Sequence, residues 1–316
     1  MIMLTEFFRF ILLILMFLDN NPTTLLGLVF FEQVLAICSN LNFQNIVVHI
    51  INGNEELKTF NKDANTFSTI ARLLVIPAYI LLIKCMTNKE ILLIDAVFTL
   101  ISGLLILPVK TIVSFQKQET EQSNSQRRKI KCNKTTCLIF LLAMMSLMVG
   151  FSDSYSISYI NLNSGTLSIG YALFVFIMTL AELLASVTSK QFDNIAEKDD
   201  NGSLIAYMSL LVAVLMFSVA VFHNVILFIL VMAIGRVVYI WLQLFTLFWY
   251  QETSKQLIMN YVALQNVAVG SVTFFNSSIG ALLIKSINIY AYLLIIGMVL
   301  LFAMILFKLI YRKCHL

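Results

Sequence analysis

The feature that most constrains this chain is a series of apolar segments, each long enough to cross a lipid bilayer. A bilayer core is about 30 Å thick, and a helix needs roughly 20 apolar residues to span it. Hydrophobic residues make up 59% of the 316 residues and charged residues 12%, with a mean hydropathy of +0.89. A soluble domain carries about 25% charged residues, so this chain cannot coat a water-exposed surface. The composition predicts an integral membrane protein and excludes a soluble enzyme, a secreted disulfide scaffold and a nucleic-acid-binding module.

Short polar stretches divide the apolar segments into ten predicted transmembrane helices. In chain order these are Glu6–Leu18, Thr23–Ile46, Asn65–Met86, Ile91–Val109, Cys137–Tyr159, Leu167–Thr188, Leu204–Phe222, Val225–Tyr250, Asn260–Ile284 and Tyr290–Tyr311. The first is short for a span unless it begins at Met1.

Lysine and arginine residues predict the orientation of the chain. The polar segment Lys110–Lys134 carries seven cations, and the positive-inside rule places it in the cytoplasm. Counting spans outward from it places both termini in the cytoplasm. The same segment divides the chain into a four-span bundle at 1–109, a basic linker at 110–136 and a six-span bundle at 137–316. Two bundles joined by such a linker are typical of transporters built from repeats.

The sequence contains no pattern that predicts a cofactor or a metal site. Five scattered cysteines imply no disulfide framework, and Cys132 and Cys137 lack the further ligands of a zinc site. No Walker A loop is present, so we expect no ATP hydrolysis by this chain. No Asp-rich, His-rich or Ser–Lys group lies at a predicted membrane interface. We therefore expect no cofactor, no metal and no enzymatic activity.

Four short motifs occur in a particular order along the predicted spans. An acid–arginine pair begins the first span, an Ala-Asn pair opens the third, an aspartate lies near the outer end of the fourth, and small residues interrupt the ninth: Glu6 and Arg9, Ala64-Asn65, Asp95, and Gly270, Ser271 and Gly280. In type and order these resemble the third, fifth, sixth and eleventh helices of the major facilitator superfamily, and within it the bacterial multidrug and macrolide efflux-like branch.

The resemblance implies a fold and an activity. It implies an all-α membrane protein of about ten spans in a two-bundle architecture, four plus six, without the family's first two helices and the glycine–arginine loop that precedes its third. It also implies a secondary transporter that exports amphiphilic small molecules by alternating access, coupled to protons. We expect the substrate, protons and the bilayer as partners, no nucleic acid, and a monomer in the plasma membrane.

Two charged residues deep in the spans are the leading candidates for the transport pathway. A charge at the centre of a membrane helix costs at least about 2.5 kcal/mol on insertion scales unless it has a partner or a watery cavity. At about 1.5 Å per residue, Glu32 and Arg236 lie roughly 14 and 16 Å from the outer ends of their spans. The resemblance makes these spans equivalent helices of the two repeats. We expect Glu32 to bind a proton and to pair with Arg236; a static interhelical pair and a simply protonated glutamate are the alternatives.

Five other residues are weaker candidates for the same pathway. Asp153 lies in the outer third of its span and could line an outward vestibule, and Glu182 lies nearer the cytoplasmic end, where snorkelling or pairing is easy. For Arg72 a gate and a structural pair fit equally well. Tyr239 and Trp241 lie deeper in the eighth span and could stack on a flat amphiphilic substrate. Packing against other helices or lipid is the commoner role for such aromatic residues.

A second functional hypothesis belongs to a different class. If the chain is a truncated product, it would be a transport-incompetent membrane protein with an immunity or assembly role. An in-frame upstream extension that encodes two spans would favour the transporter, and a stop codon or frameshift there would favour the remnant.

Overall fold

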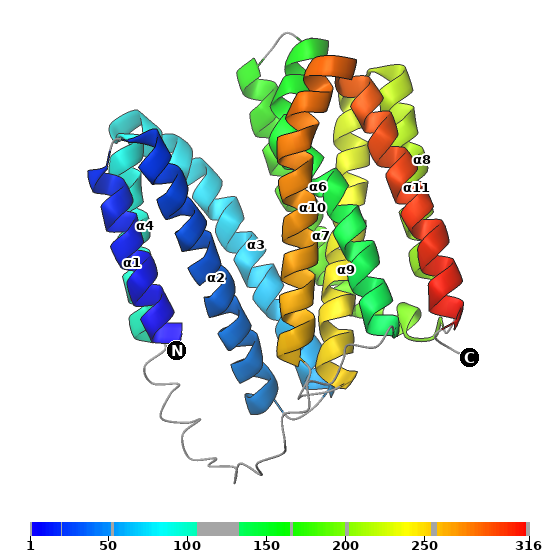
Figure 1. The fold of residues 1–316 in the computed structure, drawn as a ribbon, viewed down its shortest axis with the longest axis horizontal. Helices are drawn as coiled ribbons and strands as arrows, with labels where there is room; N and C mark the ends of the chain where they lie inside the picture. Colours follow the sequence, from blue (N-terminus) through cyan, green and yellow to red (C-terminus); the bar gives the residue numbers. More distant parts are fainter. Residues whose placement is uncertain are drawn as a thin grey trace. The chain divides into compact units, whose positions relative to one another are not determined.

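The computed structural model of the chain describes residues 2–19, 21–51, 54–105, 133–164, 167–199, 202–253 and 258–313. These residues form ten helices and no strand (Figure 1). The helices are α1 (Ile2–Leu18), α2 (Pro22–Ile50), α3 (Asn54–Cys85), α4 (Asn88–Leu105), α6 (Lys134–Ser164), α7 (Leu167–Ala196), α8 (Ser203–Phe222), α9 (Val225–Thr253), α10 (Ile258–Ile287) and α11 (Ile289–Lys313).

The predicted all-α fold with ten helices is confirmed. A chain this apolar must satisfy its backbone hydrogen bonds within each segment, and the α-helix does so. Within the described residues, six helices are long and apolar enough to cross a membrane: Lys134–Asn163, Leu173–Ala196, Ser203–Phe222, Val225–Trp249, Asn260–Ile287 and Ile289–Arg312. For α1 to α4 the membrane crossing stays a prediction.

Several helices extend beyond the predicted spans. The largest difference is in α3, which begins at Asn54 rather than at Asn65. Hydropathy detects only the apolar part of such a helix, because polar residues with good helix propensity continue it outside the lipid. Residues 110–132 of the predicted linker lie outside the described residues.

Asparagine side chains begin two of the helices at short connections. The Asn224 side-chain oxygen accepts hydrogen bonds from the backbone N–H groups of Ile226 and Leu227 at the start of α9. Asn288 does the same for Ala291 at the start of α11. These caps satisfy N–H groups that lack a partner within the helix. Asn288 itself has a φ of 76°, a left-handed conformation that asparagine tolerates better than most residues.

The chain divides into two compact units. Unit 1 contains residues 1–52 and 74–130, and unit 2 contains residues 53–73 and 131–316. The helix α3 is shared, because residues up to 73 belong to unit 2 and the rest of the helix belongs to unit 1.

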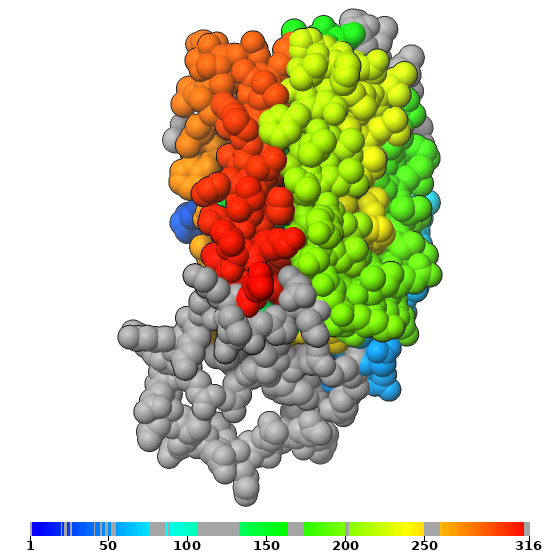
Figure 2. Space-filling model, turned by 90° about the vertical axis from the view of Figure 1, so that its right-hand side faces the viewer, coloured from blue at the N-terminus to red at the C-terminus, as the bar shows by residue number. Residues whose placement is uncertain are grey.

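Unit 2 is built around α6. This helix packs against α9, α10 and α11, and α8 packs against α11; Figure 2 shows α8 and α11 side by side on one face. Leu138, Leu142 and Met145 of α6 are completely buried. Because lipid is as apolar as these side chains, the contact is stabilised mainly by close packing rather than by the hydrophobic effect.

Unit 1 has a smaller core. The helix α1 packs against α4 and α2, and Leu13, Met16 and Ala96 are buried where α1 meets α4. The apolar residues Phe30, Phe31 and Phe98 are exposed, as expected for helices that face lipid. This arrangement leaves the polar residues of α1 and α2 facing one another.

Candidate functional site

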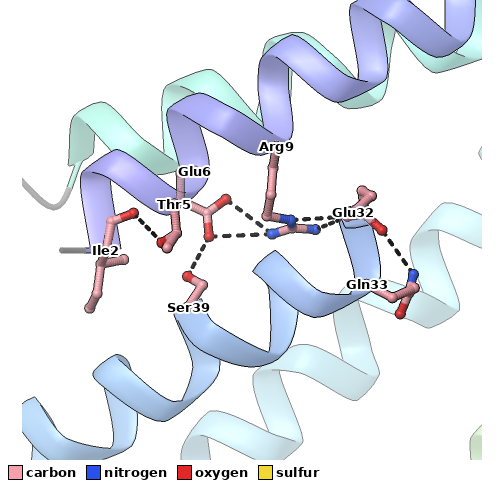
Figure 3. Close-up of polar contacts among 7 residues, drawn as sticks. All are labelled: Ile2, Thr5, Glu6, Arg9, Glu32, Gln33 and Ser39. Carbon is pink, nitrogen blue, oxygen red and sulfur yellow. Dashed lines mark hydrogen bonds and ion pairs between the residues drawn. The ribbon is translucent and has the colours of Figure 1, made fainter. Parts of the chain in front are cut away.

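A cluster of charged residues lies between α1 and α2 of unit 1 (Figure 3). The Arg9 guanidinium donates hydrogen bonds to Glu32 from Nε at 2.9 Å and from Nη2 at 2.7 Å. Its Nη1 lies 3.0 Å from Glu6 Oε2, and the Ser39 hydroxyl donates to Glu6. We call Glu6, Arg9, Glu32 and Ser39 the unit 1 cluster.

The unit 1 cluster is buried and carries one more carboxylate than cations. The side chains of Glu6 and Glu32 are only 6% and 11% exposed, and that of Arg9 is 24% exposed. Glu6 and Arg9 lie one turn apart on α1, so both side chains reach α2 from one face. With both glutamates ionised the cluster would hold a net negative charge.

A cavity of about 610 Å³ opens beside this cluster. Glu6, Arg9 and Ser39 contribute polar atoms to its wall, and most of the other lining residues are apolar. The remaining lining residues are Ile2, Ala36, Asn40, Phe43, Phe98, Ile101, Ser102 and Leu105. The unit 1 cluster is therefore reachable from a predominantly apolar space.

A second charged network joins four helices of unit 2. Arg236 of α9 lies between two carboxylates, with Nη2 3.0 Å from Asp153 Oδ1 and Nε 2.9 Å from Glu182 Oε1. The other oxygen of Glu182 lies 2.8 Å from Arg72 Nη1. We call Asp153, Arg236, Glu182 and Arg72 the unit 2 network. Its charges alternate and balance, and four of the residues predicted for the transport pathway meet in it.

The predicted pairing of Glu32 with Arg236 differs from what each residue contacts. Glu32 pairs with Arg9 in unit 1, and Arg236 pairs with Asp153 and Glu182 in unit 2. Sequence reasoning located both charges but not their partners, since it compared depths on equivalent helices and not neighbours within a unit. The sequence did contain one sign of the partner of Glu32: Glu6 and Arg9 lie three residues apart on one helix, which places a cation in an apolar segment of the same unit.

The two aromatic candidates lie beside the unit 2 network. The indole N–H of Trp241 donates to the Ala185 carbonyl and the Thr188 hydroxyl, both at 3.0 Å. The ring of Trp241 stacks on Phe192 with centroids 5.1 Å apart. Tyr239 is partly buried and packs beside Ala185. These contacts anchor α9 on α7, and a role of either residue in substrate stacking stays a prediction.

A third set of polar contacts joins the beginning of α3 to α7. Each member on α3 contacts one on α7, in the pairs Glu55–Lys190, Lys58–Glu197, Asn65–Ser186 and Arg72–Glu182. We call this set the polar ladder. Sequence analysis missed it because its α3 members precede the apolar part of that helix or were judged singly.

Lys58 is the most buried charge of the ladder. Its side chain is 5% exposed, and Nζ lies 2.5 Å from Glu197 Oε1 and 3.4 Å from Glu55 Oε1. Burial lowers the pKa of Lys58, but its hydrogen bonds and charge interactions with Glu197 and Glu55 outweigh burial and raise the pKa overall. The pKa of Glu55 is lowered, chiefly by its hydrogen bond with Lys190 and then by Lys58. Both shifts favour the charged forms that hold the ladder together.

Among the described residues, no group of three or more His, Cys, Asp or Glu side chains is arranged to hold a metal ion.

Comparison with solved structures identifies the fold. A crystal structure of a bacterial homologue of the iron transporter ferroportin, in its outward-facing state, matches with a TM-score of 0.73. The match covers 99% of this chain and 82% of that chain, at 13% sequence identity. No protein-family model matches the sequence, and no curated protein matches it. The chain shares the fold of that structure, and the predicted all-α, major-facilitator-like fold class is confirmed; membership of the superfamily and of its efflux-like branch stays a prediction.

Proposed function

We propose that this chain is a multi-pass membrane transporter that moves small molecules by alternating access and is driven by protons bound at the unit 1 cluster. The observation that carries the proposal is Arg9 held between two buried carboxylates in otherwise apolar helices. Ionisable residues in such a position are costly to keep, and they commonly mark substrate, ion or proton pathways. The fold supports the same reading, because a transporter homologue shares it.

Glu32 is the proposed proton acceptor. Glu32 accepts two hydrogen bonds from Arg9 and one from Gln33, and Glu6 accepts from Arg9 and Ser39. A proton on Glu32 would remove the charge that holds Arg9 on α2 and leave Arg9 paired with Glu6 alone. Protonation therefore weakens one link between α1 and α2 and leaves the Glu6–Ser39 hydrogen bond in place, which is the kind of change that a coupling site requires.

Arg236 is the proposed counterpart in unit 2. It ties α9 to α6 through Asp153 and to α7 through Glu182. Asp153 is 56% exposed and Glu182 only 6% exposed on their side chains. A substrate that competes for Asp153 would therefore meet Arg236 from the open side, while Glu182 keeps the arginine in place.

The polar ladder is the proposed point of opening. The ladder lies within unit 2, because residues 53–73 of α3 belong to that unit, and parting it would free the beginning of α3 from α7. The side chains of Glu55 and Lys190 are 68% and 44% exposed, and exposed ion pairs of this kind exchange with water at little net cost. The ladder would close the predicted cytoplasmic end in one state and open it in the other.

The substrate class is proposed from the efflux-like resemblance as amphiphilic organic compounds. The solved homologue is described as related to an iron transporter, which supplies the alternative substrate, a metal ion. Transport of an amphiphilic compound and transport of a metal ion are detected by different assays, so the same purified protein can be tested for both.

The test is transport in proteoliposomes with an imposed pH gradient. Purified protein is assayed with a lipophilic fluorescent dye and, separately, with iron. We expect Glu32→Gln to abolish proton-driven dye transport, because the amide cannot take up a proton. Glu56→Gln, which alters an exposed carboxylate of α3, is the matched control and should transport as the wild type does.

Dye transport at the wild-type rate in Glu32→Gln would refute the assigned proton site. Transport of iron but not dye would replace the proposed substrate, and transport of neither would favour the transport-incompetent alternative.

A further inference from the structure

A buried carboxyl group lies beside the polar ladder on α7 and takes no part in the ladder's ion pairs. Asp193 of α7 is 4% exposed and lies one helical turn before Glu197. Its Oδ1 has no hydrogen-bond donor among the residues that the structure describes. Nothing in the proposed transport cycle assigns Asp193 a role.

The charges around Asp193 are unbalanced. Lys58 and Glu55 approach from α3, and Lys190 and Glu197 lie on the same helix as Asp193. Lys58 and Glu197 interact with Asp193 electrostatically. If every carboxyl were ionised, three carboxylates would face two ammonium groups. A buried carboxylate without full hydrogen bonding is costly, and it is relieved by a proton or by a cation.

Lys58 is the nearby cation, and it can pair closely with either Glu197 or Asp193 but not with both at once. In the structure it is bound to Glu197 and lies over the Phe248 ring, with Nζ 4.4 Å from the centroid. Asp193 and Glu197 lie four residues apart on α7, about 6 Å along the helix axis. A shift of one turn would carry the lysine from one carboxylate to the other, as packed helices do when they step past each other.

We propose that Asp193 is a proton-binding site that alternates with Lys58: it holds a proton from the cytoplasm while Lys58 is bound to Glu197, and it releases that proton when Lys58 moves to it. The inference goes beyond the proposed function, because it places a second proton site in unit 2, remote in sequence from Glu32. The proton comes from water at the predicted cytoplasmic end and returns there, so no other reactant is needed.

The proposal predicts how the ladder responds to pH. While Asp193 is neutral, Lys58 stays on Glu197, which is the arrangement in the structure. At mildly alkaline pH Asp193 loses its proton and competes for Lys58, which weakens the Lys58–Glu197 pair. Glu55 and Lys190 face the same region, and Glu55 keeps its charge over this interval because its pKa is lowered.

Infrared spectroscopy of the full chain in lipid nanodiscs tests the proton directly. A neutral carboxyl absorbs separately from a carboxylate, and the spectrum is followed from mildly acidic to mildly alkaline pH. We expect Asp193→Asn to lose one titrating carboxyl band that the wild type shows. Asp63→Asn, which removes an exposed carboxylate of α3, should retain that band. The same titrating bands in Asp193→Asn and wild type would overturn the proposal.

Two further measurements keep the test independent of a single variant. In Lys58→Met the alternative partner is gone, so the Asp193 band should no longer titrate over this interval; unchanged titration would overturn the proposal. Spin labels at Thr59 and Asn194, exposed positions of α3 and α7, should show a distance that shifts with pH. The shift should be lost in Asp193→Asn, and its persistence there would contradict the proposal. None of these readouts needs transport, so they stand or fall separately from the proteoliposome assay.

Discussion

Gly235 of α9 shows how closely one residue can control packing in unit 2. A Cβ atom at this position would lie 2.0 Å from the sulfur of Met148 and 3.5 Å from Val212 Cγ1. The absence of a side chain therefore lets Met148 of α6 enter between α8 and α9. Small residues at helix contacts serve this purpose widely in membrane proteins.

We expect Gly235→Ala to destabilise the protein by about 1–3 kcal/mol, the usual cost of overpacking. Gly270→Ala is the matched control, because nothing lies within 4 Å of a Cβ there, and alanine should leave stability unchanged or raise it slightly. Thermal unfolding in detergent measures both. Equal destabilisation by the two substitutions would show that close packing at Gly235 is not the cause.

The candidate residues also show what single positions in a sequence reveal. Glu32, Arg236, Asp153, Glu182 and Arg72 stand out because charge in an apolar span is expensive, and the structure brings the last four together. Their partners could not be derived from depth alone, because a long side chain selects among several neighbouring helices. Asp193 gives no sequence signal, since it resembles any carboxylate near a helix end.

At the scale of a single helix, α4 shows how two side chains fix the first turn of a helix. Thr87 and Glu90 cap each other: the Glu90 backbone N–H donates to the Thr87 hydroxyl at 3.3 Å, and Glu90 Oε2 accepts from the Thr87 backbone N–H at 2.6 Å. This reciprocal pair is a capping box, and it lies three residues apart as that motif requires. It holds the start of α4 in place.

The capping box should respond to acid. The hydrogen bonds from the Thr87 backbone and then its side chain lower the pKa of Glu90 below its usual value of 4.5. A carboxyl whose folded pKa is lowered stabilises the fold above its unfolded pKa, and this contribution disappears as the pH falls through the folded pKa. In the wild type we therefore expect hydrogen exchange of the backbone amides in the first turn of α4 to become faster as the pH falls through the folded pKa of Glu90.

Glu90→Gln should show the faster exchange already at neutral pH and little further change in acid. Thr87→Ala should do the same, at a cost of about 1 kcal/mol for a lost cap. If Glu90→Gln retained the acid response of the wild type, another group would have to be its source.

Helix lengths mark the limit of span prediction at this scale. Hydropathy located all ten helices, because each contains an apolar core. It placed the start of α3 at Asn65 instead of Asn54, and so overlooked the turns that carry Glu55 and Lys58. Those turns are polar because they contact α7 through ion pairs, not lipid.

At the scale of the whole molecule, charge distribution predicts orientation. The positive-inside rule places Lys198 in the cytoplasm and the short connection at Asn224 outside. Single cysteines at Lys198 and Asn224, in a chain without native cysteines, should therefore react differently with a membrane-impermeant maleimide applied to intact cells. Only Asn224→Cys should be labelled before lysis, and both after it. Labelling of Lys198→Cys in intact cells would reverse the predicted topology.

The sequence by itself determined the class of this protein. Its apolar segments are long enough to span a bilayer, and lipid leaves such segments few alternatives to the helix; this is a local property that single residues and their neighbours encode. The tertiary structure decided which charges meet. Arg9 binds Glu32, Arg236 lies between Asp153 and Glu182, and Lys58 leaves Asp193 unpaired. These choices depend on how helices distant in the sequence rotate and approach one another, and hydropathy and depth along each helix do not contain that information.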